Sequence, residues 1–183
     1  YLLFSDEDWA ARGARMKCNP AVKSAADRDA LREAVRSGLI DTIATDHAPH
    51  LLADKEGGAL KAKSGMPMVQ FSLVKMLDLF GPALAAEKMC HNPARLFGVE
   101  ERGFVDVGMY ADLVLVSRRD SPHVIKDSEV LSKCGWTPLD GMTTDYKVDA
   151  TIVNGRVAYS SIDGVEAHDE ALGLPLRFNP VRR

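Results

Sequence analysis

The amino-acid sequence predicts an α/β fold, with strands and helices alternating in the first half and mostly strands in the second. Residues 15–18 have the pattern of a short strand, and Ser24 with Asp27 has the spacing of a helix-capping box. A second strand is expected at residues 41–45, after Gly38 ends the helix. Strand, helix and strand within about thirty residues form a βαβ unit, which implies a parallel sheet.

The next stretch of the chain is expected to contain a loop and two helices. Residues 51–64 are rich in charged residues and glycine and have little periodicity, which is typical of a mobile loop. Apolar residues recur at helical spacing over residues 68–80, and Gly81-Pro82 breaks that helix. We expect a further helix over residues 83–89.

The second half of the chain has the pattern of a small β-region. Residues 111–116 are predicted to form a strand. Asn154-Gly155 lies between two strand-like stretches, and this pair is the strongest short-range hairpin signal. We therefore divide the chain into an α/β segment at residues 1–98, a β segment at residues 99–160 and a C-terminal tail at residues 161–183.

Composition and charge exclude several classes of protein. The chain has 183 residues, 46% of them hydrophobic, so one or two domains with a buried core are expected. A net charge of -3 gives no basis for binding nucleic acid or an anionic membrane surface. The apolar runs, such as that around residues 112–116, are too short to span a membrane. The three cysteines are widely spaced without a CxxC pair, which argues against a disulfide framework and favours the cytoplasm.

The residues most suggestive of chemistry lie at positions 43–50, where a strand-like stretch ends in Asp46. Active sites of α/β proteins assemble at the carboxyl ends of parallel strands. His47 and His50 follow, and Pro49 keeps the loop out of a helical conformation, so both rings can reach a cleft. In the alternative, Asp46 caps the next element and both histidines lie on the surface. The strand-end position together with two histidines favours the site.

This stretch resembles a known family signature. Residues 45–50, Thr-Asp-His-Ala-Pro-His, are similar to the Asp-His-Ala-Pro-His motif of dihydroorotases, which belong to the superfamily of metal-dependent amidohydrolases. Other segments resemble parts of that superfamily in order and spacing, namely residues 17–21, 64–65, 91–98, 108–116 and 153–157. The resemblance covers nearly the whole chain, and the motif at residues 45–50 is what narrows it to dihydroorotases.

The resemblance implies a fold and a set of site residues. The fold is the C-terminal part of a (β/α)8 TIM barrel, with its last strands and helices, followed by part of a small β-sandwich. Asp46 would bind the metal and act as the catalytic acid and base, taking a proton from water and delivering it to the leaving ring nitrogen. The implied substrate-binding residues are Asn19, His50, Ser64 and Gly65. Lys23 stands where many relatives have arginine, which keeps the charge but loses the bidentate fork.

The implied activity is the reversible interconversion of (S)-dihydroorotate and N-carbamoyl-L-aspartate in pyrimidine biosynthesis, with Zn²⁺ in a binuclear centre. A catalytic zinc needs at least three protein ligands, and the chain offers one good carboxylate and no His-x-His pair. We therefore expect the C-terminal part of a longer enzyme, inactive by itself, with the other metal ligands outside this chain. The expected partners are the N-terminal part of the barrel, further copies in a homo-oligomer, and aspartate transcarbamoylase.

Two alternatives remain open. One is a sister cyclic amidohydrolase, an allantoinase or dihydropyrimidinase; such relatives usually lack the final histidine of the motif, so His50 argues against it. The other is a non-catalytic, dihydroorotase-like assembly subunit, against which the retention of Asp46 and His50 argues. Three more residues are interpreted as structural: His47 through a hydrogen bond, His91 through packing or capping, and Trp136 in a packed turn.

Overall fold

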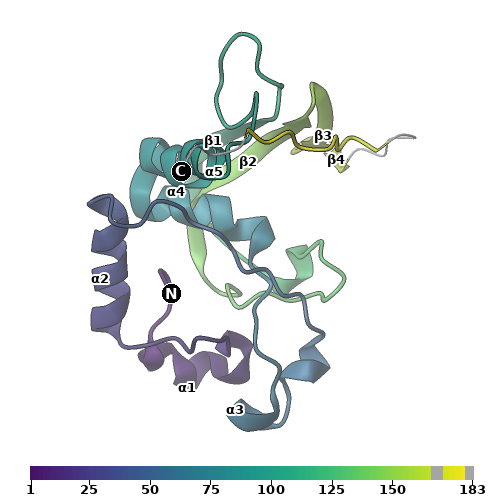
Figure 1. The fold of residues 1–183 in the computed structure, drawn as a ribbon. Helices are drawn as coiled ribbons and strands as arrows, with labels where there is room; N and C mark the ends of the chain where they lie inside the picture. The colour runs from purple at the N-terminus through teal and green to yellow at the C-terminus, as the bar shows by residue number, and fades with distance from the viewer. Residues whose placement is uncertain (166–170, 180–183) are drawn as a thin grey trace. The chain divides into compact units, whose positions relative to one another are not determined.

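The computed structural model describes residues 1–165 and 171–179, and the chain divides into two compact units. The first comprises residues 1–40, 44–75 and 123–144, and the second comprises residues 41–43, 76–122 and 145–183. Figure 1 gives the order of helices and strands along the chain. The boundaries expected after residues 98 and 160 are not tested by this division and stay a prediction. Parts of the expected tail, 166–170 and 180–183, lie outside the described residues.

Helix α2 (Ala25–Arg36) confirms the helix predicted from the spacing of Ser24 and Asp27. The Ser24 hydroxyl accepts a hydrogen bond from the Asp27 amide at 3.3 Å, and the Asp27 carboxylate accepts one from the Ser24 amide at 3.1 Å. This capping box satisfies amides that have no partner within the helix. Val35 is fully buried, and Gly38 adopts a left-handed φ of 82° just beyond the helix end.

The strand predicted at residues 15–18 is wrong. The 3-10 helix η2 (Gly13–Met16) occupies its first half. The Lys17 amide donates to the Ala14 carbonyl at 3.0 Å and closes the helix end. These backbone groups are satisfied within a local turn, so they are not available to a neighbouring strand.

The stretch at residues 51–64 has more regular structure than the loop that the sequence predicts. It forms the 3-10 helix η3 (Leu52–Lys55) and the helix α3 (Gly58–Lys61). An ion pair at 2.9 Å and a backbone hydrogen bond at 2.8 Å join Asp54 and Lys63. The other short helices of the first unit are η1 (Asp6–Asp8), α1 (Trp9–Arg12) and η5 (Asp127–Glu129).

The strand predicted at residues 41–45 is also wrong, and with it the βαβ unit. The Ile43 amide donates to the Lys88 carbonyl at 3.0 Å, so this part of the segment bonds to a helical stretch and forms no ladder there. Within residues 1–98, all of which are described, the β-pairing consists of one isolated parallel bridge between His47 and Met66. The parallel sheet expected in the first half is therefore absent from these residues.

The core of the first unit flanks two predicted substrate-binding positions. Its buried apolar members are Phe4, Met16, Cys18, Met66, Ile125 and Leu139. Burying an apolar side chain of this size contributes about 1.5–3 kcal/mol. Cys18 directly precedes Asn19, and Met66 directly follows Gly65, so both positions are next in sequence to a core anchor.

Helix α4 (Val69–Ala86) contains the break that Gly81-Pro82 predicts. Gly81 has φ 74° and ψ 172°, a non-helical conformation that interrupts the helix. A π-helical turn, η4 (Glu87–His91), and the helix α5 (Asn92–Phe97) follow. Gly98 ends α5 in the left-handed region at φ 64°.

The helical stretch from Val69 to Phe97, which Gly81 interrupts, is long and apolar enough, by length and composition alone, to cross a membrane, with a mean hydropathy of 1.3. This differs from the expectation that every apolar run is too short. The difference arises because the two halves of α4, which meet at Gly81, are followed without a loop by the π-helical turn η4 and by α5. The core helix of a soluble protein meets the same criterion.

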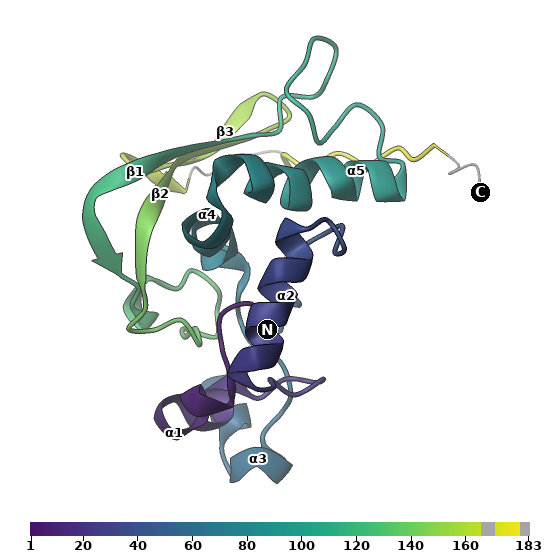
Figure 2. The ribbon, with the colours of Figure 1, turned by 90° about the vertical axis from the view of Figure 1, so that its left-hand side faces the viewer.

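The strands form one sheet in the order β1-β2-β3-β4, and Figure 2 labels the first three of them. Their bounds are β1 (Leu113–Val124), β2 (Thr143–Val153), β3 (Arg156–Ser160) and β4 (Gly164–Val165). Strand β2 pairs antiparallel with β3, and β3 with β4. Asn154 and Gly155 adopt positive φ angles of 50° and 81°, as a type I′ turn requires. The predicted hairpin is therefore confirmed.

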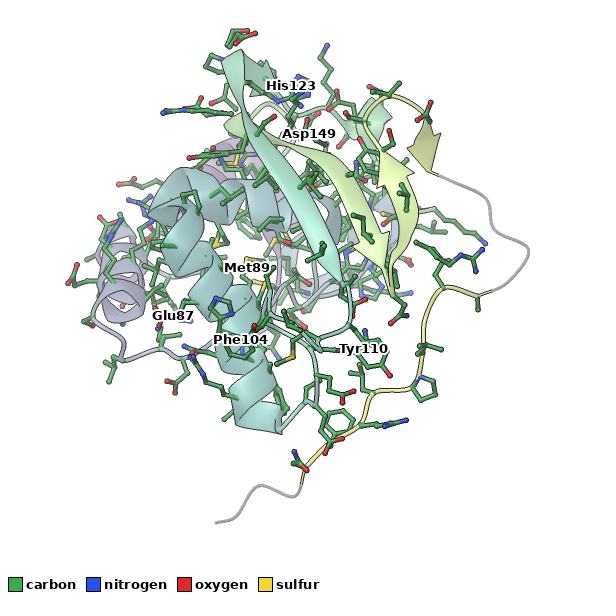
Figure 3. All side chains as sticks on the ribbon, turned by 90° about the horizontal axis from the view of Figure 1, so that it is seen from above. Glu87, Met89, Phe104, Tyr110, His123 and Asp149 are labelled. Atoms are coloured by element: carbon green, nitrogen blue, oxygen red, sulfur yellow. The ribbon has the colours of Figure 1, made fainter. Side chains whose placement is uncertain are left out.

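In the second unit, His91 is a packing residue, as predicted. Its ring stacks on Phe104, which is labelled in Figure 3, with a centroid distance of 4.6 Å and an interplanar angle of 8°. The His91 Nδ1 atom lies 2.6 Å from the Gly103 carbonyl oxygen. Gly103 adopts a φ of 87°, and an added Cβ there would overlap the Ala94 Cβ and lie 2.9 Å from the Cys90 carbonyl oxygen.

Gly103→Ala is expected to destabilise the protein more than Gly108→Ala. Both glycines have left-handed φ angles, 87° and 89°, but an added Cβ at Gly108 meets nothing within 4 Å. The shared backbone strain costs about 1 kcal/mol, and the overlap at Gly103 adds about 1–3 kcal/mol. Urea unfolding midpoints of the two variants measure the difference. Equal midpoints would contradict the close approach at Gly103.

Candidate active site

Asp46 of the signature segment adopts a left-handed φ of 46°, a conformation that aspartate tolerates better than most residues. The His47 amide donates to the Thr45 hydroxyl at 3.2 Å, which links the residues on either side of Asp46. Asp46 is exposed. The carboxylate therefore belongs to the surface of the first unit.

His47 supports the fold, as the sequence predicts. Its Nδ1 atom accepts hydrogen bonds from the Met68 amide at 3.1 Å and the Val69 amide at 3.2 Å. These amides lie at the start of α4, where backbone donors lack partners within the helix. Nδ1 therefore serves as a hydrogen-bond acceptor for both amides.

Three of the predicted substrate-binding residues lie together. The His50 Nε2 atom is 3.0 Å from the Ser64 carbonyl oxygen. Gly65 has a φ of 123°, and a Cβ added there would overlap the Ala48 Cβ and lie 3.5 Å from the His50 ring. The Ala48 amide donates to the Met66 carbonyl at 3.0 Å, which joins the two segments. Only glycine fits at position 65 in this arrangement.

Asn19 and Ser64 line a cavity of about 560 Å³ in the first unit. Asp6 and Lys17 are the other polar residues of its lining, and Trp9, Met16, Cys18 and Val22 are among the apolar ones. The Gly65 amide donates to the Lys17 carbonyl at 3.0 Å and so ties one wall to the other. A mainly apolar cavity with a few polar groups is the usual form of a small-molecule site.

Asp46 stands apart from the cavity lining, which also omits His50 and Gly65. The charge of Asp46 reaches this region: burial raises the pKa of the Tyr1 hydroxyl, and Cys18 and then Asp46 add to the shift. The structure thus places Asn19 with Ser64, and Ser64 with His50 and Gly65. The electrostatic link of Asp46 is with the Tyr1 hydroxyl, and Tyr1 is not in the cavity lining. Lys23 is exposed.

Trp136 binds the signature segment through its indole N–H, which has the hydrogen-bond partner that the sequence analysis expects for it. It is 1% exposed, and its Nε1 donates to the His50 carbonyl at 2.8 Å. Lys55 is a buried residue beside the cavity wall that was not predicted from the sequence. A buried lysine and an exposed one have the same sequence signal in a charged, glycine-rich stretch, so composition could not identify it.

The described residues do not form a metal centre by themselves. Within residues 1–165 and 171–179, no group of three or more His, Cys, Asp or Glu side chains could hold a metal ion. Asp46 can supply one carboxylate oxygen, whereas a catalytic zinc takes three protein ligands. His47 is already engaged as a hydrogen-bond acceptor through Nδ1.

Comparison with known proteins gives a consistent assignment. The pattern of the "Amidohydrolase family" matches residues 8–158. A dihydroorotase of Halobacterium salinarum is 35% identical over 174 residues, covering 92% of this chain and 40% of that protein. An allantoinase of Bacillus velezensis is 31% identical over 188 residues, covering 100% of this chain and 40% of that protein. The chain thus spans about 40% of the length of these curated relatives.

Solved structures give the same picture of the fold. The L-hydantoinase (dihydropyrimidinase) of Arthrobacter aurescens has a TM-score of 0.81 and 30% identity, over 91% of this chain and 39% of that one. The D-hydantoinase of a Thermus species also has a TM-score of 0.81, but at 20% identity it supports the fold alone. The fold is therefore of the amidohydrolase type, mixed helix and sheet.

Gly65→Ala is expected to separate the signature segment from residues 64–66. The added Cβ would overlap the Ala48 Cβ, whereas one added at Gly58, also in the left-handed region at φ 75°, meets nothing within 4 Å. Gly58→Ala therefore controls for backbone strain. Hydrogen exchange of the Ala48 amide should be faster in Gly65→Ala than in Gly58→Ala. Equal protection in both variants would show that the close approach is not needed.

Proposed function

Because this chain belongs to the amidohydrolase family, we propose that it is the C-terminal part of a dihydroorotase, which opens and closes the ring amide of dihydroorotate. The observation that carries the proposal is the contact of His50 with Ser64 and Gly65 beside a cavity that Asn19 and Ser64 line. Relatives named dihydroorotase, at 34–35% identity, support it. In this proposal, residues 1–98 belong to the (β/α)8 barrel region of the full protein, although they form no paired parallel strand by themselves, and residues 99–160 form part of a β-sandwich.

In the hydrolytic direction, Asp46 moves the proton. Its carboxylate accepts a proton from the water that attacks the ring carbonyl, and the carbon–oxygen bond forms. The ring carbon–nitrogen bond then breaks, and Asp46 delivers the same proton to the departing nitrogen. No net proton is gained or lost by Asp46, so one carboxylate serves as base and then as acid.

The proposed cofactor is Zn²⁺ in a binuclear centre, with Asp46 as one ligand and the other ligands outside this chain. An ion of this kind acidifies a water molecule and polarises an amide carbonyl when it is bound. The described residues alone do not complete such a site. Activity is therefore proposed for the full protein, and the chain by itself is expected to be inactive.

The remaining groups bind the substrate. Dihydroorotate and N-carbamoyl-aspartate carry carboxylates, and the His50 ring is already held against the Ser64 carbonyl through Nε2. Because the Ser64 carbonyl only accepts, Nε2–H is the donor there, and in this proposal the ring binds the carboxylate as an imidazolium that donates through Nδ1–H. A ring already held at Nε2 loses little rotamer freedom on binding. Asn19, Ser64 and Gly65 offer amide and hydroxyl groups to the polar edge of the ring. The cytoplasm, a homo-oligomer and association with aspartate transcarbamoylase are proposed with this function.

A second candidate is a sister cyclic amidohydrolase. The allantoinase of Bacillus velezensis, at 31% identity, and the L-hydantoinase structure, at 30% identity, favour it. The same proton transfer by Asp46 serves any of these rings, so the two candidates differ in the group that His50 contacts. A carboxylate on the ring favours dihydroorotase, because histidine can pair with it.

The purified full-length protein, supplied with Zn²⁺, is expected to hydrolyse dihydroorotate in preference to allantoin, hydantoin and dihydrouracil. The physical reason is that dihydroorotate alone among these rings carries a carboxylate for His50. The measurement is kcat/KM for each ring, followed by ultraviolet absorbance. A higher kcat/KM for allantoin or for hydantoin would replace the dihydroorotase proposal with the second candidate.

Asp46→Asn in the full-length protein is expected to lower kcat by about 10²–10⁴-fold, because an amide cannot accept and return the proton. Asparagine also tolerates the left-handed backbone at this position, so the fold should be retained. Steady-state kinetics and thermal unfolding, measured together, check both statements. Turnover close to that of the wild type would refute the part assigned to Asp46.

A further inference from the structure

One buried cation of the first unit has no part in the chemistry proposed above. The Lys55 side chain, at the end of η3, is 4% exposed. Burying an ammonium group is unfavourable unless its three N–H donors find acceptors. Burial lowers the pKa of Lys55, and the charge of Lys17 lowers it further. Specific contacts must therefore hold this lysine in place.

Those contacts are made with backbone carbonyl groups. The Lys55 ammonium donates to the carbonyls of Lys17 at 3.0 Å, Lys63 at 2.7 Å and Gly65 at 2.8 Å. The ammonium also lies 5.9 Å from the centre of the Trp136 ring. All three donors are used, and each hydrogen bond is strengthened by the charge.

The three carbonyls belong to the two segments that face the cavity. Lys17 lies two residues before Asn19, and the other two carbonyls, of Lys63 and Gly65, flank Ser64. Asn19 and Ser64 both line the cavity. The Gly65 amide adds a direct hydrogen bond to the Lys17 carbonyl at 3.0 Å. One ammonium group therefore fixes the backbone on both sides of the candidate site.

We infer that Lys55 is a positioning residue for substrate binding, which sets the spacing between Asn19 and Ser64 through the three carbonyls. This inference rests on the proposed function, since it takes the cavity to be the substrate site. Without the ammonium, the Lys63 and Gly65 carbonyls lose their partner and the Lys17 carbonyl keeps only the Gly65 amide, so the segments at Asn19 and Ser64 can separate. Substrate affinity should fall more than the rate of the proton transfer, because Asp46 has no hydrogen bond to Lys55 or to these three carbonyls.

The test is Lys55→Met in the full-length protein, because methionine keeps an unbranched apolar side chain but supplies no donor. KM for dihydroorotate should rise by about tenfold to a hundredfold, while kcat stays within about threefold of the wild-type value. Lys61→Met, on the exposed face of the neighbouring helix α3, is the matched control and should leave both constants unchanged. An unchanged KM in Lys55→Met would overturn the inference.

A double variant separates positioning from a general structural effect. If Lys55 acts through Ser64, the KM increase caused by Lys55→Met should be much smaller in a Ser64→Ala background. Additive effects on KM would overturn the inference. Should Lys55→Met fail to fold, Lys55→Gln is used instead, because its amide nitrogen keeps two N–H donors. A smaller rise in KM is then expected, and a wild-type KM would overturn the inference.

Hydrogen exchange distinguishes failure of this inference from failure of the proposed function. If the wild-type protein does not hydrolyse dihydroorotate, the proposed function fails, and kinetics no longer report on Lys55. The Gly65 amide should still exchange faster in Lys55→Met than in Lys61→Met, because its acceptor at Lys17 is no longer fixed. Equal exchange would overturn the inference. Faster exchange of the Gly65 amide in Lys55→Met with an unchanged KM would show that Lys55 has a structural role only, and this result would also overturn the inference.

Discussion

The backbone at residues 65 and 66 joins the segments that make up the candidate site. The Gly65 amide bonds to the Lys17 carbonyl, and the Met66 carbonyl accepts from the Ala48 amide, each at 3.0 Å. These bonds bring the cavity wall at Asn19 and the signature segment to the same short stretch of chain. The approach is possible because position 65 has no Cβ. Without this close approach, no backbone hydrogen bonds would hold the residues assigned to substrate binding near one another.

In the proposed function, these backbone contacts hold the substrate-binding residues but not Asp46, which transfers the proton. The binding groups are anchored: His50 by its ring contact with Ser64 and by the Trp136 indole at its carbonyl. Asp46 is exposed and adopts a left-handed φ of 46°, and its carboxylate lacks the hydrogen bonds that hold the binding groups. A carboxylate that must bind a metal and move a proton needs access to groups beyond its own segment. Exposure of Asp46 in this chain is therefore consistent with ligands supplied elsewhere in the full protein.

Local signals made part of the fold predictable from the sequence. The capping box at Ser24 and the Asn154-Gly155 turn act within a few residues, so the helix and the hairpin follow from them. The strands expected at residues 15–18 and 41–45 depend on which segment lies alongside, and Ile43 bonds to a helical carbonyl instead. The candidate site likewise contains one residue that a local motif predicts and one that depends on distant contacts. The motif identified His50, whereas burial of Lys55 depends on distant carbonyls that no local pattern encodes.

A crystal structure of the full-length Asp46→Asn protein with N-carbamoyl-aspartate tests most directly whether these segments form one substrate site. We predict ligand density in the cavity, within hydrogen-bonding distance of Asn19 and Ser64, with the His50 ring at a ligand carboxylate. Density for the ligand at another place, with the cavity empty and the His50 ring turned away, would contradict the account.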